Sequence, residues 1–332
     1  MNKRSGVRLL YTAFACMFIV TWLSGCDFRK LDYAESTVKI LYIMTSVDDV
    51  YRRKLSDAIL DAAKEQNVRV DLVETFGNVE TENQYVQSAR EKGYDVIICR
   101  PGDNSNAPLL NRASDGLPVI YVNNQPAEEH LESNKYIFVG SNEELSGKYQ
   151  AEYVISRLGT GAMNVCILEG EKGHSATIGR TAAVKATLKN HGVNANYVYV
   201  DYADWSRELA KEKFTKFTDM THNVDAVFCN NDAMALGVID AMKENGMDYT
   251  KIPVVGVDAT AEACKSVLDG EMSFTVLQNA EKQGAKAIEA AIALANGGDI
   301  SEIDGATSDR KYIWVDFEEV TIDNVQNYLE EK

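Results

Sequence analysis

Short apolar runs alternate with amphipathic stretches along most of the chain. Nine runs have the length and β-branched content of buried strands, and they lie at 38–44, 68–73, 94–99, 118–122, 136–139, 163–168, 196–200, 224–229 and 252–257. Most of the stretches between them carry apolar residues at helical spacing. In 53–66, for example, Leu55, Ile59 and Ala62 follow one another at i, i+4 and i+7. The pattern predicts strands and helices in alternation.

Continuous apolar strands that alternate with helices predict parallel sheets covered by helices on both faces. About a dozen strands would overfill one sheet, so we expect an α/β fold with two doubly wound parallel-sheet lobes. In such sheets, ligands bind beyond the carboxyl ends of the strands. That edge is therefore the place to look for functional side chains.

The N-terminal residues depart from this pattern. Positively charged residues precede an apolar run, Leu9–Trp22, which has the length of a signal-peptide core and is shorter than the ~20 residues of a spanning helix. The run ends in Leu23-Ser24-Gly25-Cys26, which resembles the lipobox of bacterial lipoproteins. We expect 1–25 to be a signal peptide and 26–36 a tether lipidated at Cys26. An uncleaved anchor is the alternative, and both place the remaining chain outside the cytoplasm at a membrane.

Charge and cysteine positions exclude some classes of function. Among 332 residues, 50 are acidic and 34 are Lys or Arg, giving a net charge of −16, which becomes −19 without the three cations of 1–25. Such an acidic chain is not expected to bind nucleic acid. Cys99, Cys166 and Cys229 lie in apolar runs and Cys264 lies elsewhere, with no CxxC spacing. We expect buried thiols in place of disulfides or metal ligands.

Polar and aromatic side chains follow the predicted strand ends. They are Asp48, Asp49 and Tyr51; Arg100; Asn123 and Asn124; His174 and Arg180; Asp201 and Trp205; Asn230, Asn231 and Asp232; Asp258; and Gln278 after the apolar run 273–277. Singly, each has a structural explanation: Asp49 or Asn231 can cap a helix, and Trp205 can belong to the core.

Together, these side chains suit a neutral sugar. Sugar hydroxyls both donate and accept hydrogen bonds. They can therefore donate to the carboxylates, accept from the guanidinium group, and do both with the amides. The C–H faces of a pyranose lie well against aromatic rings. A phosphate ligand would instead call for a glycine-rich loop, and the chain has neither a P-loop motif nor a complete G-x-G-x-x-G. The G-x-S-x-G signature of a nucleophile elbow is also missing around Ser175.

From about Val38 to Tyr328, the chain resembles the type I periplasmic-binding-protein family, in particular its galactose- and glucose-binding members. The segment from Gly170 to His174, with Arg180 and the later Trp205, is the most specific part of the resemblance. The resemblance implies a monomeric, non-enzymatic receptor without a cofactor. It would bind a monosaccharide by hinge closure and deliver it to an ABC permease. A receptor for a membrane kinase or chemoreceptor, and a binder of a pentose such as ribose, are the alternatives.

The resemblance also implies which residues bind the sugar: Asp49, Tyr51, Asn123, His174, Arg180, Trp205, Asn231, Asp258 and Gln278, with Arg100 and Asn124 as further candidates. Tyr51 and Trp205 would sandwich the ring. Three positions depart from the family pattern, because Tyr51 stands in place of Phe, Gln278 in place of Asn, and Ala176 in place of a hydroxyl-binding Asp. Loss of that charged acceptor costs about 1.5–3 kcal/mol and puts the exact sugar in doubt.

The family's chain crosses between its lobes three times. The resemblance places these crossings near Gly140-Ser141, Gln278-Asn279 and Lys311-Ile313. The expected N-lobe is then 37–140 with 280–311, and the expected C-lobe is 141–278 with 312–330. The connection 158–164 lacks the run of Asp or Asn that a calcium loop needs, so we expect no calcium site there.

Overall fold

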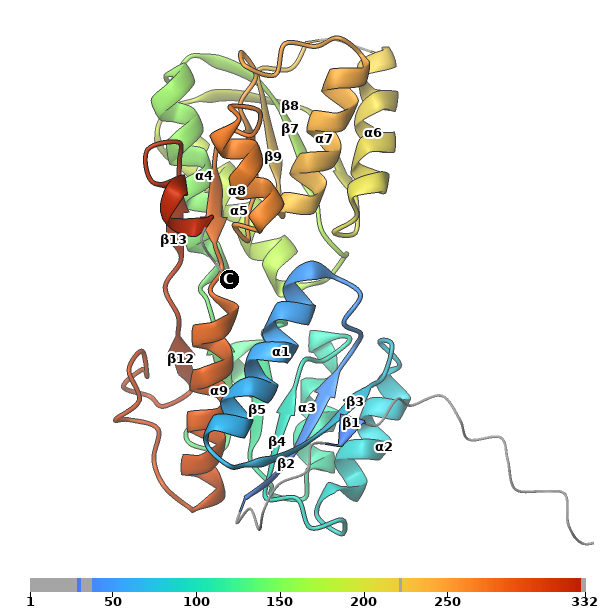
Figure 1. Ribbon diagram of the computed structural model, residues 1–332, viewed down its shortest axis with the longest axis vertical. Helices are drawn as coiled ribbons and strands as arrows, with labels where there is room; N and C mark the ends of the chain where they lie inside the picture. The colour runs from blue at the N-terminus through green and yellow to red at the C-terminus, as the bar shows by residue number, and fades with distance from the viewer. Residues whose placement is uncertain (1–28, 31–37, 221–222, 330–332) are drawn as a thin grey trace, which may run out of the picture.

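The computed structural model describes residues 29–30, 38–220 and 223–329. It has two α/β lobes, one above the other, joined by extended segments (Figure 1). The predicted signal peptide and Cys26 lie outside the described residues, as does most of the predicted tether. No helix within the described ranges is long and apolar enough to cross a membrane.

The N-lobe is built on a seven-stranded sheet in the order β1-β3-β2-β4-β5-β6-β12. Its strands are β1 (Arg29–Lys30), β2 (Lys39–Met44), β3 (Arg69–Glu74), β4 (Val96–Cys99), β5 (Val119–Val122), β6 (Tyr136–Gly140) and β12 (Tyr312–Trp314). All neighbours pair in parallel except β1, which pairs antiparallel with β3. Its helices are α1 (Val50–Glu65), α2 (Val79–Ala89), α3 (Ala107–Ala113) and α9 (Ala280–Ala295).

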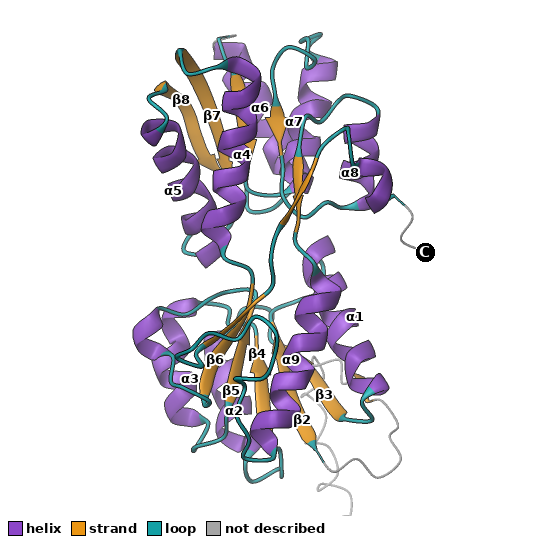
Figure 2. Cartoon of the chain, turned by 90° about the vertical axis from the view of Figure 1, so that its left-hand side faces the viewer, coloured by secondary structure: helices purple, strands orange, loops and turns teal. Residues whose placement is uncertain are grey.

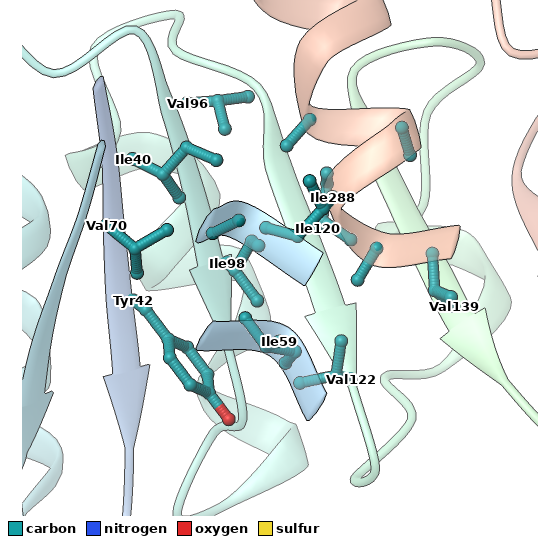
Figure 3. Packing of buried hydrophobic residues seen from close by; sticks show 14 of the residues in the cluster. Ile40, Tyr42, Ile59, Val70, Val96, Ile98, Ile120, Val122, Val139 and Ile288 are labelled. Carbon is teal, nitrogen blue, oxygen red and sulfur yellow. The ribbon is translucent and has the colours of Figure 1, made fainter. Parts of the chain in front are cut away.

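The helices cover both faces of this sheet. Ile59 of α1 and Ile288 of α9 pack against Tyr42, Ile98 and Ile120 of the strands, as Figure 3 shows. Helices α2 and α3 cover the opposite face. Strands buried on both faces must be apolar at every position, which explains the continuous runs in the sequence.

The C-lobe has a four-stranded parallel sheet in the order β10-β9-β7-β8 and a two-stranded antiparallel sheet of β11 and β13. The strands are β7 (Ala162–Glu169), β8 (Asn194–Tyr202), β9 (Ala226–Cys229), β10 (Val254–Val255), β11 (Thr275–Leu277) and β13 (Glu318–Val320). The helices are α4 (Glu143–Leu158), α5 (Ser175–Asn190), α6 (Arg207–Met220), α7 (Asp232–Glu244) and α8 (Ala261–Leu268). Helices α4 and α5 cover one face, while α6, α7 and α8 cover the other.

Three connections join the lobes, between β6 and α4, between β11 and α9, and between β12 and β13. Figure 2 shows the extended segments passing from one lobe to the other. The third crossing differs from its expected position at Lys311-Ile313. Residues 312–314 form β12, which pairs with β6 of the N-lobe, and the chain enters the C-lobe only before β13. A strand of three residues is too short to show a recognisable pattern in the sequence. Only its pairing with β6 shows that 312–314 belong to the N-lobe.

The expected α/β architecture with two doubly wound lobes is confirmed. Each of the nine predicted strands is present, with boundaries within two residues of those expected. Cys99, Cys166 and Cys229 lie in β4, β7 and β9, and Cys264 lies in α8; all four are buried thiols. The connection between α4 and β7 spans only 159–161.

Candidate functional site

A pocket lies between the two lobes, where the loops after the strands of both sheets face each other. The N-lobe contributes Asp49, Tyr51, Arg52, Arg100 and Asn123, and the C-lobe side contributes His174, Ala176, Arg180, Trp205, Asn231, Asp258 and Gln278. The structure therefore brings together all nine residues expected to bind the ligand, together with Arg100. Asn124 does not line the pocket, because its side chain binds the Pro101 carbonyl and the Ser175 N–H.

Three of these residues are also helix caps. Asp49 Oδ1 accepts from the Arg52 N–H at 2.9 Å, His174 Nδ1 from the Ala176 N–H at 3.1 Å, and Asn231 Oδ1 from the Met234 N–H at 3.0 Å. Capping and pocket lining are thus compatible at one residue. Each cap fixes a side chain through one polar atom. Asp49 and His174 each keep a second polar atom for a ligand, whereas Asn231 Nδ2 also donates to the Trp205 carbonyl at 3.4 Å. The amino termini of α1, α5 and α7 consequently face the pocket and carry positive partial charge.

Arg180 is a deeply buried cation of the pocket, with 3% of its surface exposed, and it is not part of a solvated helix face. Its Nε donates to Glu143 Oε2 at 2.7 Å, and its two Nη groups donate to the Asn230 carbonyl at 2.5 Å and to Gln278 Oε1 at 3.0 Å. Glu143 and Gln278 each lie next to a crossing between the lobes. Arg180 therefore connects the pocket to two hinge segments.

Asp258 carries a buried carboxyl group beside this network. Burial raises the pKa of Asp258 well above its ordinary value, Arg180 opposes the shift, and the carboxylates of Asp232 and Asp49 reinforce it. Asp258 also has a φ of 122°, while Asn123 and Trp205 have φ values of 61° and 63°. Residues other than glycine rarely adopt a positive φ. The backbone strain that a positive φ causes is concentrated at functional sites in proteins.

Trp205 presents its ring to the pocket with support from two neighbours. The His174 ring meets it edge to face, with centroids 5.3 Å apart and planes at 78°. Gly170 lies directly behind it, since a Cβ at this position would be 2.1 Å from the indole. Gly170 is therefore needed for the ring to occupy this position. Arg180 Cζ lies 5.9 Å from the same ring.

Glu171 bridges the two lobes at the rim of the pocket. Its Oε1 lies 3.3 Å from Arg52 Nη1, and its Oε2 lies 3.3 Å from Arg100 Nη2. A second contact between the lobes joins the Gln125 N–H to Ser175 Oγ at 2.8 Å. The sequence analysis missed Arg52, Glu143 and Glu171. One feature of the sequence could have indicated that Arg52 lines the pocket. It is the third residue after the capping Asp49 and lies at the same end of α1.

Two further features bear on what this site can do chemically. His174 Nδ1 accepts a backbone hydrogen bond, so the neutral ring carries its proton on Nε2. Burial, and then the positive charges of Arg100, Arg180 and Arg52, hold the pKa of His174 well below its ordinary value. Within the described residues, no group of three His, Cys, Asp or Glu side chains is arranged to hold a metal ion.

Comparisons with known proteins give consistent matches. A family model described as periplasmic binding protein domain matches residues 40–299. A putative rhizopine-binding protein of Rhizobium meliloti is 29% identical over 289 residues, which cover 86% of this chain and 90% of its own length. A D-galactose/methyl-galactoside binding periplasmic protein of Haemophilus influenzae is 28% identical over 235 residues, covering 67% and 70%. The structure of an ABC transporter solute binding protein from Bacillus halodurans with bound myo-inositol superposes with a TM-score of 0.79 at 26% identity, covering 90% of this chain and 99% of its own.

Proposed function

Because the chain belongs to the periplasmic-binding-protein family, we propose that it is an extracytoplasmic receptor for a hexose, with galactose and glucose as the first candidates. The observation that carries this proposal is the pocket between the lobes. Asp49, Asp258, Asn123 and Asn231 supply carboxylates and amides there, beside the ring of Trp205. As a member of this family, the chain is a solute-binding protein and not an enzyme.

The polar atoms left after capping match a polyhydroxylated ring. Asp49 keeps one carboxylate oxygen to accept from a hydroxyl, and His174 keeps the Nε2 proton to donate to one. A single carboxylate at Asp49 can accept from either epimer of the C4 hydroxyl, which supports both glucose and galactose as ligands. The indole of Trp205 offers an apolar face to the ring C–H groups.

Binding would proceed by closure of the hinge without chemistry on the sugar. Asp49 and Asn123 belong to the N-lobe, while Asn231 and Asp258 belong to the C-lobe, so only a closed cleft lets one ligand contact all four. A ligand shifts an equilibrium toward the state it binds more tightly, and the sugar therefore favours the closed form.

A cyclitol such as myo-inositol is the second candidate. The Bacillus halodurans structure, at 26% identity, holds myo-inositol. Relatives named for D-allose and ribose are 26% identical to the chain, which keeps a pentose as an alternative. Ala176 and Gln278 are the positions at which the pocket departs from the galactose-binding pattern, and both line it.

The proposed receptor is a monomer that delivers its ligand to an ABC permease, or alternatively to a sensor kinase or chemoreceptor. It is held at the membrane by lipid on Cys26. Metabolic labelling with radioactive palmitate tests the anchor, because Cys26→Ala should abolish incorporation. Incorporation that persists in this variant would contradict lipidation at Cys26.

Calorimetric titration of the full chain in detergent tests the ligand class, with D-galactose, D-glucose, D-ribose, D-xylose and myo-inositol in parallel. We expect saturable heat with a hexose and a micromolar Kd, which corresponds to about −8 kcal/mol. Asp49→Asn is the matched variant, since Asn caps a helix as well as Asp does. Its lost charge should weaken hexose binding about tenfold or more. Tighter binding of myo-inositol than of any hexose would show that the ligand is a cyclitol. No heat with any hexose would refute the proposal that the ligand is a hexose.

A further inference from the structure

One end of the pocket carries side chains that offer a ligand mainly hydrogen-bond donors. We call Arg52, Arg100, Asn123 and His174 the donor end. The two arginines have no acceptor atoms. His174 Nδ1 is occupied by the Ala176 N–H, which leaves the Nε2 proton. Asn123 Oδ1 accepts from Arg100 Nε at 3.2 Å, which leaves the Asn123 amide protons.

The residues of the donor end are close to one another. Arg52 and Arg100 reach the two oxygens of the same carboxylate, that of Glu171. Glu171 and His174 lie three residues apart in the loop before α5. Burial, and then the charges of Arg100, Arg180 and Arg52, lower the pKa of His174, and all four side chains line the same pocket.

The carboxylates that form ion pairs with the donor end lie at its rim. Glu171 does not line the pocket, and 37% of its side chain is exposed. Arg52 also pairs with Asp48 at 2.8 Å, and 76% of the Asp48 side chain is exposed, so water screens this charge. Within the pocket, Ala176 stands where the resemblance calls for an Asp. Two guanidinium groups and the amino terminus of α5 therefore face the pocket, and the ion pairs of both guanidinium groups are with rim carboxylates. Asp49 also lines the pocket, and the buried Glu82 acts on Arg100 from outside it.

The pocket also holds acceptors. Burial, and then the charges of Asp258, Glu143 and Asp49, raise the pKa of the Tyr51 hydroxyl, and the charge of Arg180 opposes them. Asp258 and Asp49 line the pocket and can accept from sugar hydroxyls. The donor end therefore stands beside carboxylates that serve the hydroxyls of the ring.

The donor end selects a substituent of the ligand. A hydroxyl at the donor end would accept well, but its own proton would lack a partner, and a buried donor without a partner is costly. A carboxylate has two acceptor oxygens and no proton, and it pairs with guanidinium groups in charge-assisted hydrogen bonds. We propose that the ligand is a sugar acid, a hexuronate whose carboxylate binds Arg52, Arg100, Asn123 and His174. This inference rests on the proposed hexose site and specifies its substrate class.

The test is a comparison within pairs of sugars that differ only at C6. The full chain in detergent is titrated by calorimetry with D-galactose and D-galacturonate, and with D-glucose and D-glucuronate. We expect the acid of at least one pair to bind tenfold or more tightly than its neutral partner. The preference should shrink with added salt, because charge pairing at the partly exposed rim is screened.

Two variants test the donor end directly. Arg52→Met removes one cation and should lower the ratio of acid to neutral affinity about tenfold. Ala176→Asp places a carboxylate at the donor end and should reverse the ratio, and Asp in the first turn of α5 favours the helix. Ala176→Asn is the control of equal size without charge, and it should change the ratio much less than Ala176→Asp.

The outcomes separate this inference from the function on which it rests. Acid and neutral hexose binding equally, or the neutral hexose binding more tightly, would refute the sugar acid and leave the hexose receptor standing. No binding of either member of any pair would refute both. An equal response of the affinity ratio to Ala176→Asp and Ala176→Asn would also refute the sugar acid, because charge would then not be the cause.

Discussion

Glu171 of the C-lobe lies 3.3 Å from the guanidinium of Arg100 in the N-lobe. Arg100 is only 2% exposed, and burying a cation is costly unless it is paired. Because its carboxylate partner belongs to the other lobe, opening of the cleft separates the pair. The ion pair between Glu171 and Arg100 therefore stabilises the closed arrangement of the lobes.

Glu171→Gln should weaken this stabilisation. We expect the variant to bind its sugar about fivefold more weakly, a modest effect because Glu171 is partly exposed to water. Small-angle X-ray scattering of the ligand-free variant should give a larger radius of gyration than the wild type. Glu212→Gln, which breaks the exposed pair with Lys216 within α6, is the matched control. Equal scattering and equal affinity in wild type and variant would contradict this role of the ion pair.

Gly170→Ala should displace Trp205. The new Cβ would overlap the indole at 2.1 Å, so the ring must move away from the pocket. We expect sugar affinity to fall about tenfold, the scale of one lost aromatic contact. Gly161→Ala is the control, since a Cβ at that position meets nothing within 4 Å. If the two variants bind equally well, the position of Trp205 over Gly170 does not matter for binding.

Tyr51→Phe should separate stability from affinity. The Tyr51 hydroxyl is buried and has no hydrogen-bond partner among the described residues. Removing it should leave the free energy of unfolding unchanged or raise it by about 1 kcal/mol, because a buried unpaired hydroxyl is unfavourable. The same change should weaken sugar binding severalfold if the hydroxyl serves the ligand. Urea unfolding and calorimetry measure the two quantities, and a loss of stability without loss of affinity would contradict this role.

His174 should make stability depend on pH. In the folded protein its pKa lies well below the ordinary value, so the ring stays neutral while the unfolded chain takes up a proton below about pH 6.5. The unfolded state then binds more protons, and the free energy of unfolding falls by up to about 1.4 kcal/mol per pH unit as the pH decreases. In His174→Gln this contribution should be absent between pH 7.5 and 5.5, whereas the exposed His191→Gln should retain it. Parallel pH profiles for wild type and His174→Gln would contradict the assignment.

The sequence predicted which residues line the pocket, because strand ends are easy to recognise. Continuous apolar runs mark the buried parallel strands, and parallel strands end at one edge of a sheet. Asp49, Asn231 and Asp258 were found in this way, and the pocket contains all three. The resemblance to the periplasmic-binding-protein family is confirmed by the family match over 40–299.

The parts that sequence reasoning missed depend on partners far along the chain. Glu171 meets Arg52 across 119 positions, and Glu143 meets Arg180 across 37. Neither carboxylate has a local pattern that distinguishes it from a solvated acid. Asn124 illustrates the opposite error, because it follows Asn123 directly yet binds the backbone of Pro101 and Ser175. Proximity to a strand end does not determine which neighbour faces the pocket.

The most direct test of sugar binding between the lobes is a fluorescence titration with D-galactose and D-glucose in the Trp314→Phe background. Trp314 lies in β12 and stacks on Tyr312 outside the pocket, so its removal isolates the signal of Trp205 among the described residues. The proposed function predicts a saturable change in emission that disappears when Trp205→Ala is added. No saturable change with either hexose, or the same change after Trp205→Ala, would contradict it.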